Sequence, residues 1–131
     1  MLIKAVGWVY VKARRLLCVR SAGKDAFYLP GGKPEVGESD WQALSREVRE
    51  ELRVELSQSS WQLWATIEAP AHGYCPPAWV CLTCYRAEFV GVLQPDSEIE
   101  ELAWLQYGDR DRCAPATAEV IALLFSQRLI D

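Results

Sequence analysis

Residues 31–54, GGKPEVGESDWQALSREVREELRV, constrain the fold more than any other stretch, because they join a glycine-rich turn to an amphipathic helix. Ser39 is a favourable N-cap, and Gln42 three residues later completes a capping box, so we expect the helix to begin near residue 40 and to run to about residue 53. Apolar residues at steps of three and four then predict one stripe buried against a sheet or another helix: Trp41, Leu44, Val48 and Leu52.

Three acids share another face of this helix, because Glu47, Glu50 and Glu51 stand at i, i+3 and i+4. Like charges at this spacing repel by about 0.2–0.5 kcal/mol per pair. The acids also lie in the second half of the helix, where the macrodipole disfavours carboxylates. A hard divalent cation such as Mg2+ or Mn2+ would offset both costs. The spacing alone leaves a solvated helix face as the alternative.

The order of the fixed residues resembles the Nudix box, G-x5-E-x7-R-E-U-x-E-E-x-G-U, in which U is aliphatic. Gly32, Glu38 and the run from Arg46 to Val54 match eight of its nine defined positions. The exception is Arg53, where the family has glycine. Residues 27–31, FYLPG, are also similar to the segment that precedes the box in the family.

The resemblance implies a role for each matching position. The implied metal ligands are the backbone carbonyl of Gly31 and the carboxylates of Glu47, Glu50 and Glu51. Gly32 takes a structural role, and Glu38 and Arg46 form the pair that orients the cluster. Arg53 falls where the family's helix ends in a left-handed cap, so it puts the helix-end geometry in question and removes no ligand.

The implied function is a Mg2+-dependent Nudix pyrophosphohydrolase that cleaves a nucleoside diphosphate linked to another group. The favoured reaction converts a (d)NTP to the monophosphate and pyrophosphate. Dinucleoside polyphosphates and ADP-sugars are alternative substrates. A non-catalytic, nucleotide-binding sensor is an alternative of a different class, which the retention of every box acid disfavours.

The general base of such an enzyme is either a box glutamate or an acid in a later loop. Three residues of the run DSEIEELAW are candidates: Glu98, Glu100 and Glu101. Glu98 is favoured because it precedes the expected strand, where a loop can turn it inward. The alternative for each of them is an exposed strand edge.

Several basic and aromatic residues are candidates for substrate binding. Arg20 and Lys33 are candidates for the outer phosphates, and Tyr28, with Tyr74 or Trp79 as alternatives, for stacking on a base. His72 is the only histidine and stands in a proline-rich loop at the expected mouth of the site. The competing interpretations are solvated charges and buried rings.

The length of 131 residues predicts a single domain, residues 1–131. A net charge of −4 argues against a broad basic surface for nucleic acid, so the expected partner is a small nucleotide. No signal peptide or membrane span is recognisable, and we expect a cytoplasmic protein. Oligomeric state is left open.

An odd number of cysteines, five, without a secretion signal predicts reduced thiols. Their spacing with the histidine gives a possible zinc site, H-x2-C-x5-C-x2-C, formed by His72, Cys75, Cys81 and Cys84. Alternation over residues 79–89 predicts a strand that sends Cys81 and Cys84 to opposite faces, which disfavours this site.

Hydrophobic alternation predicts strands over 2–10, 15–20, 27–29, 61–69, 79–89 and 99–105. Polar turns are expected at 11–14 and 21–24, a loop at 70–77 and a charged loop at 108–113. Pro115 suits the first turn of a terminal helix that runs to about residue 129. These elements predict an α/β domain with helices packed on a mixed β-sheet. The family resemblance narrows this to a Nudix-type α/β/α sandwich.

Overall fold

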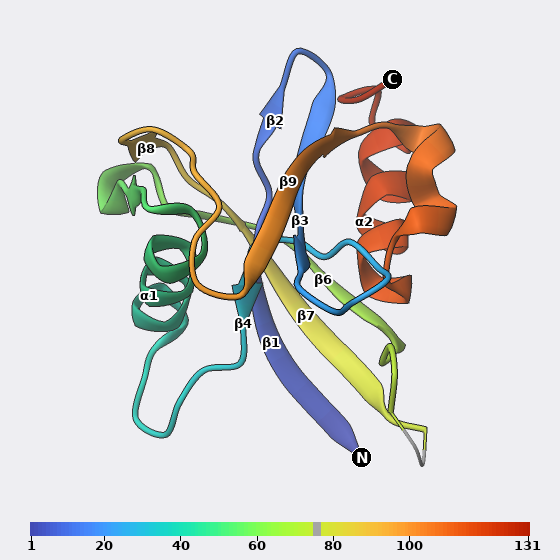
Figure 1. The fold of residues 1–131 in the computed structure, drawn as a ribbon, viewed down its shortest axis with the longest axis horizontal. Coiled ribbons are helices and arrows are strands. Elements are labelled where there is room, and N and C mark those ends of the chain that lie inside the picture. Colours follow the sequence, from blue (N-terminus) through green and yellow to red (C-terminus); the bar gives the residue numbers. More distant parts are fainter. Residues whose placement is uncertain (75–76) are drawn as a thin grey trace.

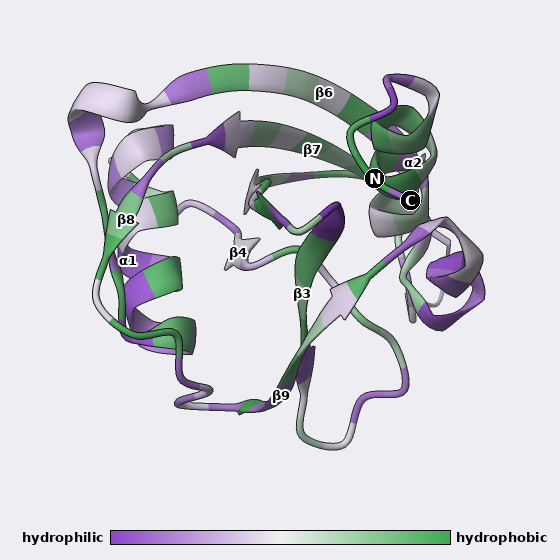
Figure 2. Ribbon diagram, turned by 90° about the horizontal axis from the view of Figure 1, so that it is seen from above, coloured by the Kyte–Doolittle hydropathy of each residue, from purple (hydrophilic) through white to green (hydrophobic). Residues whose placement is uncertain are grey.

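The structure is a computed structural model that describes residues 1–74 and 77–131. Two α-helices, α1 (Asp40–Leu52) and α2 (Pro115–Ser126), lie on opposite sides of the strands in this part of the chain (Figure 1). The turned view in Figure 2 gives the same arrangement, with the strands between the two helices. The predicted α/β class with helices on a mixed sheet is confirmed.

The mixed sheet has the strand order β4-β1-β7-β6. Its strands are β1 (Leu2–Trp8), β4 (Gly31–Gly32), β6 (Gln62–Pro70) and β7 (Trp79–Arg86). β1 and β7 are parallel, whereas β1 pairs antiparallel with β4, and β6 with β7. The pairing with β4 places the glycine-rich turn beside the first strand.

A second sheet is antiparallel, in the order β2-β3-β9. It consists of β2 (Val11–Lys12), β3 (Arg15–Ser21) and β9 (Ile99–Leu105). Two short strands, β5 (Glu55–Leu56) and β8 (Phe89–Val90), form a separate antiparallel pair. Because β9 pairs with β3, the acid-rich segment that precedes β9 lies on the same side of the molecule as β3.

The buried apolar residues form two clusters, one against each helix. Leu44, Val48 and Leu52 of α1 are fully buried against residues that include Val6 and Trp8 of β1. The other cluster packs the buried face of α2 against further residues of the strands: Val9, Leu16, Cys18, Leu82, Cys84, Val120, Ile121 and Leu124. Alternate residues of β3 point to the two clusters, as a period of two requires.

The helix α1 begins and ends as its sequence predicts. The Ser39 side chain accepts from the Gln42 N–H, and the Gln42 side chain accepts from the Ser39 N–H, so the capping box is present. Arg53 is the C-cap and is left-handed, with φ of 61°. Of the predicted stripe, Trp41 is only partly buried, because its ring packs edge-on against Trp61 at the rim of the cluster.

Three predicted boundaries are wrong. The expected turn at 11–14 contains β2, because a two-residue turn with positive φ at Ala13 and Arg14 closes a hairpin with β3. The 27–29 segment forms isolated bridges from Phe27 and Tyr28 in place of a strand. The expected strand 79–89 is interrupted after Arg86, where the chain leaves the mixed sheet and pairs with β5.

The C-terminal region differs at two further points. The charged loop expected at 108–113 is a 3-10 helix, Tyr107–Arg112, which begins with a reciprocal capping interaction between Gln106 and Asp109. The last helix ends at Ser126, because Arg128 is left-handed and the Leu129 N–H bonds back to the Leu124 carbonyl. No helix in the described ranges is long and apolar enough to cross a membrane.

Candidate active site

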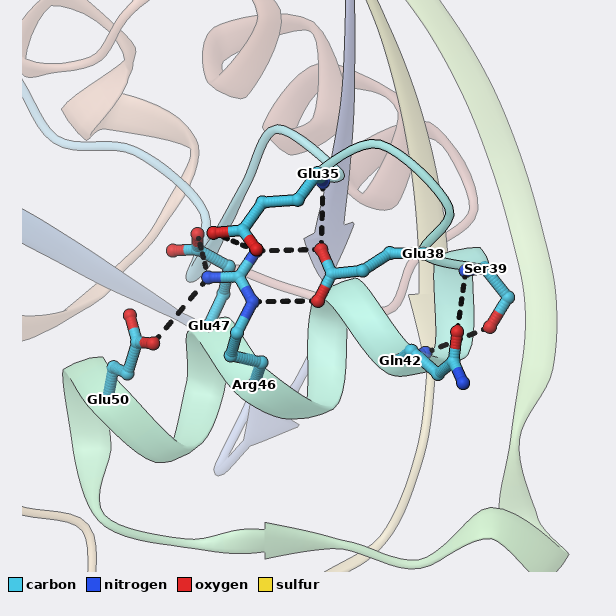
Figure 3. Close-up of polar contacts among 7 residues, drawn as sticks. All are labelled: Glu35, Glu38, Ser39, Gln42, Arg46, Glu47 and Glu50. Carbon is cyan, nitrogen blue, oxygen red and sulfur yellow. Dashed lines mark hydrogen bonds and ion pairs between the residues drawn. The ribbon is translucent and has the colours of Figure 1, made fainter.

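Arg46 is the centre of a polar network on the acidic face of α1 (Figure 3). Its guanidinium donates twice to Glu38, from Nε at 2.8 Å and from Nη2 at 2.9 Å. It also donates from Nη1 to Glu47 at 2.9 Å and lies 3.6 Å from Glu50. The hydrogen bonds to Arg46, together with the Glu35 N–H, lower the pKa of Glu38 to about 2. The sequence therefore predicts the association of Glu38 with Arg46 correctly.

Glu51, the third acid of this helix face, is only 6% exposed. One of its oxygens accepts the Gly31 N–H at 3.0 Å, and no lysine or arginine among the described residues forms an ion pair with it. Burial raises the pKa of Glu51 to about 8, the Gly31 N–H opposes the rise, and the charges of Glu47, Glu98 and Glu50 add to it. Burial also raises the pKa of Glu47, while Arg46 opposes that rise.

The two glycines of β4 allow the turn to approach α1 and β1 closely. A Cβ on Gly31 would stand 2.0 Å from the backbone oxygen of Val6, and Gly31 has φ of 145°. A Cβ on Gly32 would stand 2.7 Å from Cδ of Glu47. Only glycine therefore fits at these positions with the acids where they are.

The chemistry of this donor set fits a hard cation. Glu47, Glu50 and Glu51 supply carboxylate oxygens from one helix face. Glu51 is buried and has no basic partner in the part of the chain that the structure describes, and a cation would offset the cost of burying its charge. In this structure Arg46 pairs with Glu47 and Glu50. Within residues 1–74 and 77–131, no three histidine, cysteine, aspartate or glutamate side chains are grouped so as to hold one ion. Because Arg46 pairs with Glu47 and Glu50, it would compete with a cation for these two carboxylates.

A cavity of about 440 Å3 opens beside these acids. Glu47, Glu51, Glu98 and the two glycines of β4 line one part of it, whereas Glu50, whose side chain is 53% exposed, does not. Apolar side chains from β1, β7 and the start of α2 line another part, together with the buried Thr117. The size is that of a small-molecule site.

The three candidate bases, Glu98, Glu100 and Glu101, differ in what they contact. Glu101 accepts from Nε of Arg20 at 2.8 Å, and Glu100 lies 3.5 Å from the same guanidinium. Glu98 is the one of the three that lines the cavity. Arg20 lies with Glu100 and Glu101 and does not line the cavity, so its contact with phosphate stays a prediction without structural support.

Three contacts join the segment after β6 to the rest of the cavity mouth. Tyr28 Oη bonds to Nδ1 of His72, and His72 Nε2 lies 3.4 Å from Asp25. Lys33 Nζ donates to Tyr74 Oη at 2.9 Å. Tyr28, Lys33, His72 and Tyr74 all line the cavity, whereas Trp79 is exposed outside it. The sequence thus identifies four residues that the fold brings together.

The structure offers no support for the zinc alternative. Cys84 lies in the α2-side cluster with Leu82, and Cys81 does not belong to that cluster, as strand alternation predicts. Cys75 is outside the described residues. Burial raises the pKa of the Cys84 thiol to about 12, which suits a structural thiol.

Three residues near the site were not identified from the sequence. Asp25 is separated from His72 by 47 positions, and no local pattern joins them. Thr117 could have been noticed as the polar residue on the buried face of an otherwise apolar helix. Asp96 carries no motif, and its importance depends on a contact with Arg53 that only the fold creates.

Comparisons with known proteins agree with this geometry. A family model described as NUDIX domain matches residues 1–124. The solved structure of the Escherichia coli protein ORF135 is 27% identical, with a TM-score of 0.75 over 97% of this chain and 91% of that one.

Two further structures show the same fold at lower identity. A NUDIX hydrolase from Nitrosomonas europaea is 17% identical, with a TM-score of 0.76 over 99% of this chain and 92% of that one. A MutT NUDIX hydrolase from Burkholderia pseudomallei is 23% identical, with a TM-score of 0.67 over 82% and 85%. No curated protein matches the sequence. The match over residues 1–124 shows that the chain belongs to the Nudix family, whose hydrolases act on phosphoric anhydrides.

Proposed function

We propose that this Nudix protein is a Mg2+-dependent hydrolase of a nucleoside diphosphate linked to another group, and that it converts a (d)NTP to the monophosphate and pyrophosphate. The observation that carries the proposal is the position of Glu51, which is buried beside Glu47 and Glu98 in one cavity and has no basic partner among residues 1–74 and 77–131. Dinucleoside polyphosphates and ADP-sugars remain the alternative substrates for the same site.

Each acid takes a distinct part in the proposed reaction. Glu47, Glu50 and Glu51, with the Gly31 carbonyl, would hold Mg2+, which would supply positive charge to offset the phosphate charge and would make the attacking water more acidic. Glu98 accepts the proton of the attacking water at its carboxylate. Its place in the cavity, while Glu100 and Glu101 pair with Arg20, supports this choice.

The remaining residues bind the substrate and hold the acids in place. Arg46 and Glu38 orient Glu47, since Arg46 contacts both carboxylates. Lys33 contributes positive charge for the outer phosphates at the cavity mouth. Tyr28 and His72 contact the nucleoside, for which the apolar part of the cavity supplies a wall.

The test is phosphate or pyrophosphate release from a panel of nucleotides with and without Mg2+, using wild type, Glu51→Gln and Glu55→Gln. Glu55 is the matched control, because it pairs with Arg49 on the surface and does not line the cavity. We expect release that requires Mg2+, falls by more than about 10²-fold in Glu51→Gln and is unchanged in Glu55→Gln. Absence of release, together with nucleotide binding that survives in Glu51→Gln, would leave the sensor function in its place.

A further inference from the structure

Arg53 stands where the Nudix box has glycine, and it keeps the backbone conformation that glycine would adopt. Its φ and ψ of 61° and 27° are left-handed, which is unfavourable for a residue with a Cβ. A glycine would end the helix with less strain. Any advantage of arginine over glycine at this position must therefore come from the contacts of its side chain.

The guanidinium of Arg53 holds Asp96, which lies in the segment between β8 and β9. Arg53 Nε donates to Asp96 Oδ2 at 2.8 Å, while Asp96 Oδ1 accepts the Ser97 N–H at 2.7 Å. These bonds lower the pKa of Asp96. Arg53 and the Ser97 N–H thus each bind one oxygen of this carboxylate.

The backbone of the same segment is bound to the carbonyl end of α1. The Asp96 N–H donates to the Glu51 carbonyl at 2.9 Å, and the Gln94 N–H donates to the Leu52 carbonyl at 3.1 Å. The segment therefore satisfies two carbonyls that the end of a helix leaves free. Because Glu51 is also the buried acid, the Asp96 N–H joins this segment directly to the residue that carries that carboxylate.

Glu98 follows Asp96 by two residues and lines the cavity with Glu47 and Glu51. Ser97 between them is left-handed, with φ of 55°, and its Oγ donates to Glu98 Oε2 at 2.7 Å. The Glu98 carbonyl accepts the Ala22 N–H at 2.8 Å, so the backbone of Glu98 is also held. The orientation of Glu98 thus depends on a turn that Asp96 begins.

We propose that Arg53 is a positioning residue for hydrolysis, which holds residues 94–98 against the end of α1 through Asp96 and thereby aims Glu98 into the cavity. This inference rests on the proposed function, in which Glu98 is the base. The arginine that interrupts the family motif is then a functional substitution in this chain, because its ion pair contributes an attachment that glycine cannot supply.

The first experiment compares Arg53→Gly and Arg53→Asn with wild type. Both residues tolerate the left-handed conformation, so the fold should be retained, while the guanidinium is lost. We expect kcat to fall about tenfold with KM within about twofold and no decrease in Tm, and Arg53→Lys to recover part of kcat. Arg49→Ala is the matched control, because Arg49 forms an exposed ion pair with Glu55 near the same helix end and its ion pair does not involve residues 94–98, so the change should leave kcat unchanged.

The second experiment combines Arg53→Gly with Glu98→Gln. If Arg53 acts through Glu98, Arg53→Gly will have no further effect on kcat in the Glu98→Gln background, whereas a general structural role would reduce kcat by the same factor in both backgrounds. Hydrogen exchange at the Gln94 and Asp96 amides should also become faster in Arg53→Gly.

The outcomes separate this inference from the proposed function. A wild-type protein without turnover refutes the function and the role of Arg53 together. Normal wild-type turnover, with unchanged kcat and unchanged amide exchange in Arg53→Gly, overturns the inference alone. Equal reductions of kcat in the two backgrounds also overturn it.

Discussion

Gly31 and Gly32 are adjacent, but the structure requires a glycine at each for a different reason. Gly31 faces the backbone of β1, which cannot move aside, and its φ is positive. Gly32 faces the end of the Glu47 side chain, which can rotate away. Glycine at position 31 is therefore required for the fold, and glycine at position 32 is required to keep the Glu47 carboxylate in place.

We expect Gly31→Ala and Gly32→Ala to separate stability from activity. Gly31→Ala should lower the free energy of unfolding by at least about 1–3 kcal/mol, because the backbone conformation is unfavourable and the new Cβ meets Val6. Gly32→Ala should leave the free energy of unfolding within about 1 kcal/mol, because Glu47 can rotate, and should reduce kcat about tenfold or more. Urea unfolding and turnover measured on both variants test this, and a strongly destabilised Gly32→Ala with normal kcat would contradict it.

At the scale of elements, the sequence predicts best those whose signals are local. The α1 helix has its capping box at Ser39 and Gln42 and a buried stripe at Leu44, Val48 and Leu52, all within 14 residues. The two-residue strands β4, β5 and β8 have no room for alternation, and only their partners in space define them. For the same reason the sequence predicts one continuous strand over 79–89, whereas in the structure β7 ends at Arg86 and the following strand, β8, pairs with β5.

The turn before α1 is attached to the middle of the helix by Glu38, and this attachment depends on pH. Arg46 and the Glu35 N–H hold the pKa of Glu38 at about 2, below its usual value of 4.5. A carboxyl group with a lowered pKa in the folded state contributes stability that is present above the unfolded pKa, and that stability is lost as the pH falls through about 4.5 towards 2. The stabilisation should therefore be complete at pH 7.

Glu38→Gln should lower Tm at pH 7 and approach the wild-type Tm as the pH is reduced below 4. Glu35→Gln is the matched control, because Glu35 is exposed and lies 4.0 Å from the same guanidinium, so its effect should be small at every pH. Thermal unfolding of the three proteins between pH 3 and pH 7 measures this. A Tm difference for Glu38→Gln that does not change with pH would show that the pair contributes by packing alone.

At the scale of the whole molecule, the site depends on contacts between distant parts of the sequence. The family resemblance predicts the acids of α1, and they share one helix face because their spacing in the sequence places them there. The cavity mouth joins Tyr28 to His72 and Lys33 to Tyr74, and the sequence identifies these residues without identifying their partners. Such pairs follow from the parallel pairing of β1 with β7 and from the loops it brings together, which no local spacing encodes.

The two apolar clusters share strands, so we expect them to unfold together. In β3, Leu16 and Cys18 face the α2 side, while Leu17 and Val19 face the α1 side. Loss of packing on one side therefore weakens the strand that the other side requires. Most of the tryptophans associated with the clusters lie on the α1 side, namely Trp8, Trp41, Trp61 and Trp104, whereas Trp64 packs on the α2 side.

Leu124→Ala tests this coupling, because Leu124 is fully buried on the α2 side. The cavity it leaves should lower the free energy of unfolding by about 2–5 kcal/mol. Tryptophan fluorescence and far-UV circular dichroism should report the same shifted midpoint, even though most cluster tryptophans lie on the other side. Leu44→Ala, the equivalent change on the α1 side, should shift both signals in the same way. A fluorescence midpoint that stays at the wild-type value while the dichroism midpoint falls would show that the two sides of the molecule unfold separately.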